Sequence, residues 1–212
     1  MVNKSYYFAA LVIIAFAALP LFIRWERGNG RRGRELAVLA VMTAIAVGTR
    51  GLFYMLPEVK PMAAVVVITA AAYGAEAGFM TGVISAFISN FFFGQGPWTP
   101  WQMLALGLVG LLSGILFSRK KIEKRGQLLG LAICGGLGVT IIYGVIMDTS
   151  SVLLATNTVS FSMLFAAYGA GFTFNLIHGV STVLFIVVLA KPILNKLYRM
   201  KKKYGVFRGH AV

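Results

Sequence analysis

The sequence contains few charged residues, and acidic residues are the scarcest. Only 12% of the 212 residues are charged, with six Asp and Glu against twenty Lys and Arg. A soluble domain has about 25% charged residues, because its surface faces water on every side. The composition therefore excludes an ordinary soluble domain.

Residues that carry common chemistry are also scarce. Cys134 is the only cysteine, so the chain cannot form an internal disulfide. Of the two histidines, His210 lies near the C-terminus, and no carboxylate is close to His178 in sequence, which argues against a metal site. The chain has no G-x-x-x-x-G-K-[ST] pattern for ATP phosphates and no evident Ser-His-Asp set. We therefore predict that it is not an enzyme and has no cofactor of its own.

Long apolar runs occupy most of the chain. Hydrophobic residues make up 58% of it, and the mean hydropathy is +0.82. A helix needs roughly 20 apolar residues to cross about 30 Å of hydrocarbon. The runs predict seven spans, at residues 6–23, 35–56, 61–76, 77–93, 101–118, 126–148 and 164–190. The expected fold class is an all-α integral membrane protein.

The net charge of +14 lies in short segments beside these runs, so nucleic acid is not an expected partner. Basic residues are concentrated in cytoplasmic loops of membrane proteins. The clusters at 24–34, 119–125 and 191–208 share one side only if residues 61–93 turn at 74–78. We therefore predict a hairpin there, an outer N-terminus and a cytoplasmic C-terminus in the plasma membrane.

The first run, at residues 6–23, invites comparison with a signal peptide. Only Lys4 precedes it, whereas Arg24, Arg27 and further arginines follow, and Ile23-Arg24-Trp25 is a poor cleavage site. A retained extra helix is therefore expected. The predicted organisation is 1–34 for this helix and a basic cytoplasmic loop, 35–190 for a six-helix membrane core, and 191–212 for a basic cytoplasmic tail.

The most unusual segment joins two spans on the predicted outer side. Residues 94–102 contain two glycines, two prolines, two tryptophans and two glutamines. An aromatic belt at the membrane surface would explain the tryptophans. A ligand platform would explain the rings and the amides together. Under the second explanation, the candidate binding residues are Gln95, Trp98, Trp101 and Gln102, together with Asn90 on the preceding helix.

Three further candidates for ligand binding lie inside predicted spans. Arg50 is roughly 10 Å below the outer end of its helix, and a charge at that depth usually faces protein or water. Arg50 is expected to extend outward to the membrane surface, to pair with Asp148 or Glu58, or to face a ligand cavity. Asn175 and His178 are three residues apart and share a helix face. A contact between helices and a ligand-facing pair both fit this spacing.

Two other patterns concern helix contacts and loops. Ala40, Ala44 and Gly48 are four residues apart, a spacing that lets another helix approach closely. Packing inside the molecule and docking onto a partner helix both explain it. Residues 149–163 are rich in Ser and Thr and are predicted to form a long outer loop, a feature that often binds ligands.

The stretch from Arg34 to about Leu116 resembles the substrate-binding S components of energy-coupling factor (ECF) transporters. The resemblance rests on residues 34–36, 60–61, 73–79 and 89–102, and the Phe-Gly-Gln-Gly-Pro-Trp-Thr-Pro-Trp-Gln run is its specific part. It implies a six-helix S-component-like bundle with a pocket open to the outside, to which this chain adds one N-terminal helix.

The resemblance also implies a function and partners. An S component captures a vitamin outside the cell for ATP-driven uptake, assembled with a transmembrane T component and two cytoplasmic ATPase subunits. Ala40, Ala44 and Gly48 map onto its T-component contact, and Trp98, Trp101, Gln102, Asn175 and His178 onto its pocket. The chain looks most similar to members proposed to take up cobalamin or a related corrinoid, while riboflavin, pantothenate and queuosine-type ligands remain open.

Two other classes of function are considered. An autonomous permease or channel would need no partner, but no inverted repeat supports it. A membrane enzyme would need an acid-base group, for which His178 and Asp148 are the candidates.

Overall fold

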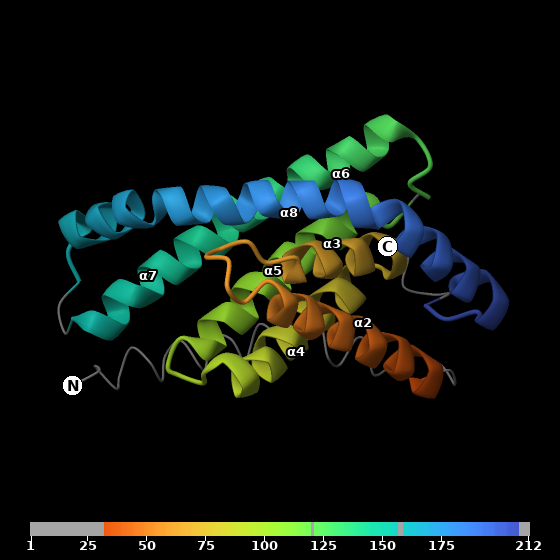
Figure 1. Cartoon of the computed structure of the whole chain (residues 1–212), viewed down its shortest axis with the longest axis horizontal. Helices are drawn as coiled ribbons and strands as arrows, with labels where there is room; N and C mark the ends of the chain where they lie inside the picture. The colour runs from red at the N-terminus through yellow and green to blue at the C-terminus, as the bar shows by residue number, and fades with distance from the viewer. Residues whose placement is uncertain (1–31, 120, 157–158, 208–212) are drawn as a thin grey trace.

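The computed structural model describes residues 32–119, 121–156 and 159–207, and the extra helix predicted at 6–23 lies outside these ranges. Within them all regular structure is helical, which confirms the predicted fold class (Figure 1). In chain order the elements are α2 (Arg32–Leu52), α3 (Met62–Tyr73), α4 (Ala75–Phe93), α5 (Thr99–Phe117), α6 (Arg125–Leu137), the π-helix η1 (Gly138–Tyr143), α7 (Gly144–Ala155) and α8 (Phe161–Tyr204).

Five helical segments among the described residues are long and apolar enough to cross a membrane. They are α2, α4, α5, the continuous α6–η1–α7 segment and α8. The sixth apolar helix, α3, is shorter. Together they correspond to the six predicted spans of the core.

The short helix α3 lies at the centre of the bundle. All twelve of its residues are buried, and it contacts α2, α4, α5, α6 and α8. A helix that is apolar on every side belongs inside other helices rather than at a surface. At 1.5 Å per residue it is about 18 Å long, well short of the roughly 30 Å of a bilayer core. Its surroundings are therefore protein rather than lipid.

The predicted hairpin between α3 and α4 is confirmed. Gly74 separates the two helices and has a φ of 107°, a conformation that glycine adopts without steric cost. Gly78 then lies directly against Ala70, so α4 folds back along α3. One glycine is enough to make the turn that the sequence placed over residues 74–78.

The helices α4 and α5 approach closely enough for their backbones to touch. A Cβ atom on Gly78 or Gly82 would overlap α5, and one on Gly110 or Gly114 would overlap α4 or the Gly74 turn. Each pair is four residues apart, which places its members on one helix face. Small residues allow this close packing where lipid removes the usual hydrophobic driving force.

The last two described helices extend beyond the membrane spans predicted for them. Residues 149–155 belong to α7 instead of an outer loop, because Ser150 and Ser151 turn their hydroxyls back to the carbonyls of Met147 and Asp148. Such local bonds satisfy the hydroxyls within a helix. The helix α8 continues past residue 190 to Tyr204, so the segment predicted as a basic tail begins as helix.

The chain turns back after α8. Gly205 has a φ of 63°, and Val206 and Phe207, which follow it, are buried. The backbone N–H of Phe207 donates to the Glu35 carboxylate at 2.6 Å, and its ring stacks on Tyr73 at 4.6 Å between centroids. We call residues 205–207 the C-terminal hook. It joins the end of α8 to the beginning of α2 and the end of α3.

Candidate functional site

Polar side chains from α2, α4 and α5 meet at the end of the bundle predicted to face outward. Asn90 is fully buried at their centre. Its amide oxygen accepts from Arg50 Nη1 at 2.8 Å, and its amide nitrogen donates to Thr99 Oγ1 at 2.9 Å and Gln102 Oε1 at 2.8 Å. Arg50 also donates to Ser89 and lies over the Phe93 ring, with its Cζ 5.1 Å from the centroid. One amide therefore links three helices.

The same network continues toward α8. Gln102 Nε2 donates to the Tyr143 hydroxyl at 3.4 Å, and the Tyr143 ring meets the His178 ring edge-on with centroids 5.0 Å apart. His178 Nδ1 is 3.8 Å from a Glu58 carboxylate oxygen, and the other oxygen of Glu58 pairs with Lys60 Nζ at 3.1 Å. We call the set Lys60, Glu58, His178, Tyr143, Gln102, Asn90 and Arg50 the polar network.

Local backbone features hold two members of the network in place. Tyr143 ends the π-helix η1, which contacts both α5 and α8. A π-helical turn is wider than an α-turn and is frequent at functional sites. Glu58 has a φ of 57°, which is uncommon for a residue with a side chain. Ser181 of α8 donates to its carbonyl at 3.5 Å, which fixes the loop over His178.

The remaining predicted residues of the 94–102 segment are Gln95, Trp98 and Trp101. Gln95 accepts from Thr99 Oγ1 at 2.8 Å, and Thr99 Oγ1 accepts from Asn90, so two hydrogen bonds connect Gln95 to Asn90. Trp98 is 41% exposed and its ring lies over Gly96, where a Cβ atom would overlap it. The Trp101 indole N–H is buried without a hydrogen-bond partner among the described residues. Most buried donors in folded proteins have a hydrogen-bond partner, so this N–H is an exception.

Asn175 lies in a different contact. Its amide donates to Asp148 at 2.8 Å, and it packs against Gly144 where α7 meets α8. Asn175 and His178 do face the same neighbouring segment, as their spacing predicted. Only His178 joins the polar network.

The small residues of α2 are exposed rather than packed against another described helix. Ala40, Ala44 and Gly48 border a groove of about 700 Å³ between α2 and α4, whose other wall includes Met80, Ile84 and Phe92. A Cβ atom on Gly48 would meet nothing within 4 Å. Among the described residues, these three small side chains line an apolar groove, and packing inside the molecule and docking onto a partner helix both stay predictions.

The structure also corrects the expected partners of Arg50. Its hydrogen-bond partners are the neutral oxygens of Ser89 and Asn90, and within the described chain it forms no ion pair with Asp148 or Glu58. The sequence analysis missed Ser89, Thr99 and Tyr143. Tyr143 carried a signal, since a phenol in the middle of an apolar run needs a polar partner.

These features define a multi-pass helical membrane protein with a buried network of polar side chains at one end of its bundle. The chain belongs to the ECF-type riboflavin transporter S component family, whose family model matches residues 32–199. It is therefore the membrane-embedded substrate-binding subunit of an ECF importer, a class that associates with a T component and ATPase subunits at the plasma membrane. The family is one of transporter subunits and not of enzymes.

Several curated proteins are similar to the chain. A UPF0397 protein of Aliivibrio fischeri strain MJ11 is 27% identical over 150 residues, which cover 68% of this chain and 76% of the relative. A UPF0397 protein of A. fischeri strain ATCC 700601 / ES114 has the same identity and coverage. A UPF0397 protein of Aliivibrio salmonicida strain LFI1238 is 33% identical over 66 residues, 30% of this chain and 36% of the relative. No solved structure matches the chain significantly.

Proposed function

We propose that the polar network is the floor of a vitamin-binding site that opens to the outside of the cell. The observation that carries this proposal is the convergence of Arg50, Asn90, Gln102 and His178 from four helices at one end of the bundle. A buried network of this kind is costly in a membrane and marks a ligand site more often than a packing contact. The outward direction follows from placing the basic clusters in the cytoplasm.

The substrate we propose first is riboflavin, the vitamin that the family description names. A flat heteroaromatic ring with polar edges needs a stacking surface and amide partners. Trp98 offers an exposed ring, the half-buried Gln102 offers an amide, and Trp101 has an unused indole N–H. A corrinoid, proposed from the resemblance of the sequence, is the competing ligand.

A binding panel tests the substrate directly. The chain is purified in mild detergent and titrated with riboflavin, cobalamin, cobinamide, pantothenate and queuosine by calorimetry, with riboflavin fluorescence as a second readout. Saturable one-to-one binding of riboflavin is expected. One-to-one binding of a corrinoid instead would identify a different vitamin as the substrate and leave the proposed function unchanged. Binding of no vitamin would overturn the proposal.

We further propose that the groove beside Ala40, Ala44 and Gly48 receives a helix of the T component. Gly48→Phe should abolish copurification of the T component and the ATPases, because the ring would fill the space that a partner helix needs. Vitamin binding should be unchanged, since nothing lies within 4 Å of a Cβ at this position. Pull-down from cells that express the whole transporter measures the loss.

The matched control is Gly169→Phe, which adds the same ring at an equally open helical glycine on α8. It should retain the ATPases. Full retention by Gly48→Phe would place the docking surface elsewhere. Vitamin uptake into liposomes that contain this chain alone would favour an autonomous permease.

A further inference from the structure

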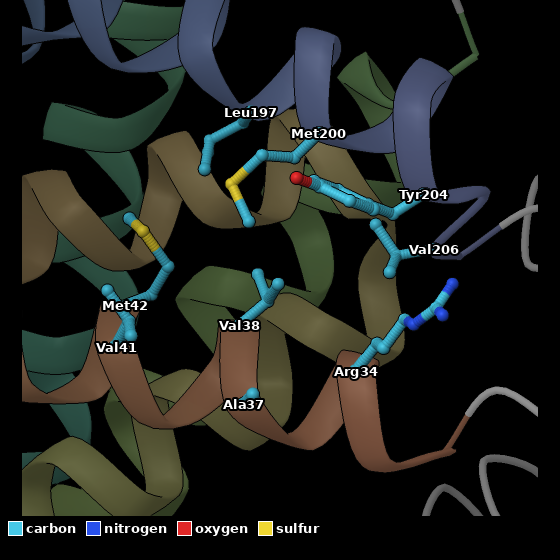
Figure 2. A pocket seen from close by; sticks show the side chains of 9 residues that line it. All are labelled: Arg34, Ala37, Val38, Val41, Met42, Leu197, Met200, Tyr204 and Val206. Carbon is cyan, nitrogen blue, oxygen red and sulfur yellow. The ribbon is translucent and has the colours of Figure 1, made fainter.

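An apolar cavity lies at the opposite end of α2 from the polar network. It measures about 310 Å³ and is lined by Ala37, Val38, Val41 and Met42 of α2 and by Leu197 and Met200 of α8. Figure 2 shows these side chains facing one another across the cavity, with Arg34 at one edge beside Val206. Val206 belongs to the C-terminal hook, so the hook forms part of the wall.

The cavity is about as long as one leaflet of the bilayer is deep, and its wall is apolar. From Arg34 to Met42 the helix rises about 12 Å, close to the depth of one hydrocarbon leaflet. The wall is apolar along that length, and the only charged side chain in the lining is Arg34. Arg34 forms no ion pair within the described part of the chain. An apolar slot with a cation at one edge suits an amphiphile that carries a negative charge.

A basic groove adjoins this cavity. It measures about 800 Å³, is bordered by Lys196, Arg199, Lys202 and Lys203, and shares Met200 and Tyr204 with the apolar cavity. Each Lys or Arg near a membrane surface contributes on the order of 1 kcal/mol to the binding of anionic lipid. The charged group of a ligand in the cavity could therefore contact Arg34 on the cavity side of Tyr204 and the basic residues of α8 on the groove side.

We propose that these two adjoining sites bind one anionic phospholipid, with an acyl chain between α2 and α8 and its phosphate between Arg34 and the basic face of α8. The site is independent of vitamin binding, because Arg34 and Arg50 are about 24 Å apart along α2. Its role is to hold the end of α8 and the C-terminal hook against the first turns of α2.

The test uses the full chain in mild detergent, with thermal unfolding followed as phosphatidylglycerol, phosphatidylcholine or inorganic phosphate is added. Phosphatidylglycerol should raise the melting temperature by about 5 °C at saturation, because a ligand that binds only the folded state stabilises it. An equal rise with phosphatidylcholine would overturn the headgroup part of the proposal. An equal rise with inorganic phosphate would indicate that the site binds a soluble anion, and it would overturn the proposal that the ligand is a lipid.

Two variants address the two halves of the site. Arg34→Gln removes the cation, and Ala37→Phe fills the apolar slot from an exposed position on α2. Each should remove most of the shift caused by phosphatidylglycerol, and native mass spectrometry should show at least a tenfold loss of retained lipid. Arg119→Gln, which removes an exposed charge at the end of α5, should leave both the temperature shift and the amount of retained lipid unchanged. Unchanged retention in both site variants would overturn the proposal, and vitamin binding reports separately that each variant is folded.

Discussion

Asn90→Leu is expected to abolish vitamin capture. The side chain is fully buried and connects Arg50, Thr99 and Gln102 through three hydrogen bonds. Leucine has a similar volume but offers no acceptor to the Arg50 guanidinium and no donor to the two oxygens. The half-buried guanidinium of Arg50 then keeps only Ser89 as a hydrogen-bond acceptor among the described residues, and a lost hydrogen bond to a charged group costs about 1.5–3 kcal/mol. Calorimetric titration with the vitamin identified by the panel should show a fall in affinity of at least about 100-fold.

The matched control for this substitution is Asn175→Leu. It also removes an amide, here a half-buried one whose partner is Asp148 in the contact between α7 and α8. Asn175→Leu should lower the melting temperature and leave the affinity within a few-fold of that of the unmodified chain. If Asn90→Leu bound the vitamin normally, the binding site would lie outside the polar network.

Gly110→Ala is expected to prevent the bundle from closing. A Cβ atom at this position would overlap the backbone carbonyl of Gly78. A backbone cannot rotate away as a flexible side chain can, so α4 and α5 must separate along their whole contact. Overpacking costs about 1–3 kcal/mol where side chains can adjust, and this site should exceed that range. Size-exclusion chromatography and thermal unfolding in detergent should show aggregation or a large fall in melting temperature.

Gly126→Ala provides the comparison, because a Cβ there would meet nothing within 4 Å. The same change of one methyl group should then be neutral or slightly stabilising, since alanine favours helix by about 1 kcal/mol over glycine. Equal stability of the two variants would mean that α4 and α5 do not touch at Gly110.

The sequence predicted the six core spans because each one is bounded by charge, glycine or proline. It predicted the ends of α7 and α8 poorly for a physical reason. A high content of serine and threonine suggests a loop. Inside a helix, however, their hydroxyls donate to carbonyls of the preceding turn, as Ser150 and Ser151 do. Likewise, the lysines and arginines beyond residue 190 suggest a tail and are also good helix formers.

The sequence indicated which residues are candidates for the site, but not which of them contact one another. Amides, a buried arginine and a histidine in apolar spans were sufficient to indicate Arg50, Asn90, Gln102 and His178. Their pairing needed the fold, because Tyr143 and Glu58 come from distant parts of the chain. Spacing alone also could not distinguish the exposed small residues of α2 from the glycines of α4 and α5 that touch backbone to backbone.

The burial of α3 has a consequence for how the chain enters the membrane. At about 18 Å it is too short to cross the hydrocarbon on its own, so the translocon must receive it together with α4 as one hairpin. Its later neighbours α5, α6 and α8 are not yet synthesised at that moment. The Tyr73 hydroxyl bonds the carbonyl of Leu197, which is 124 residues further along the chain. The innermost helix of the protein is thus among the first to be inserted, and its surroundings are completed only when the last helix arrives.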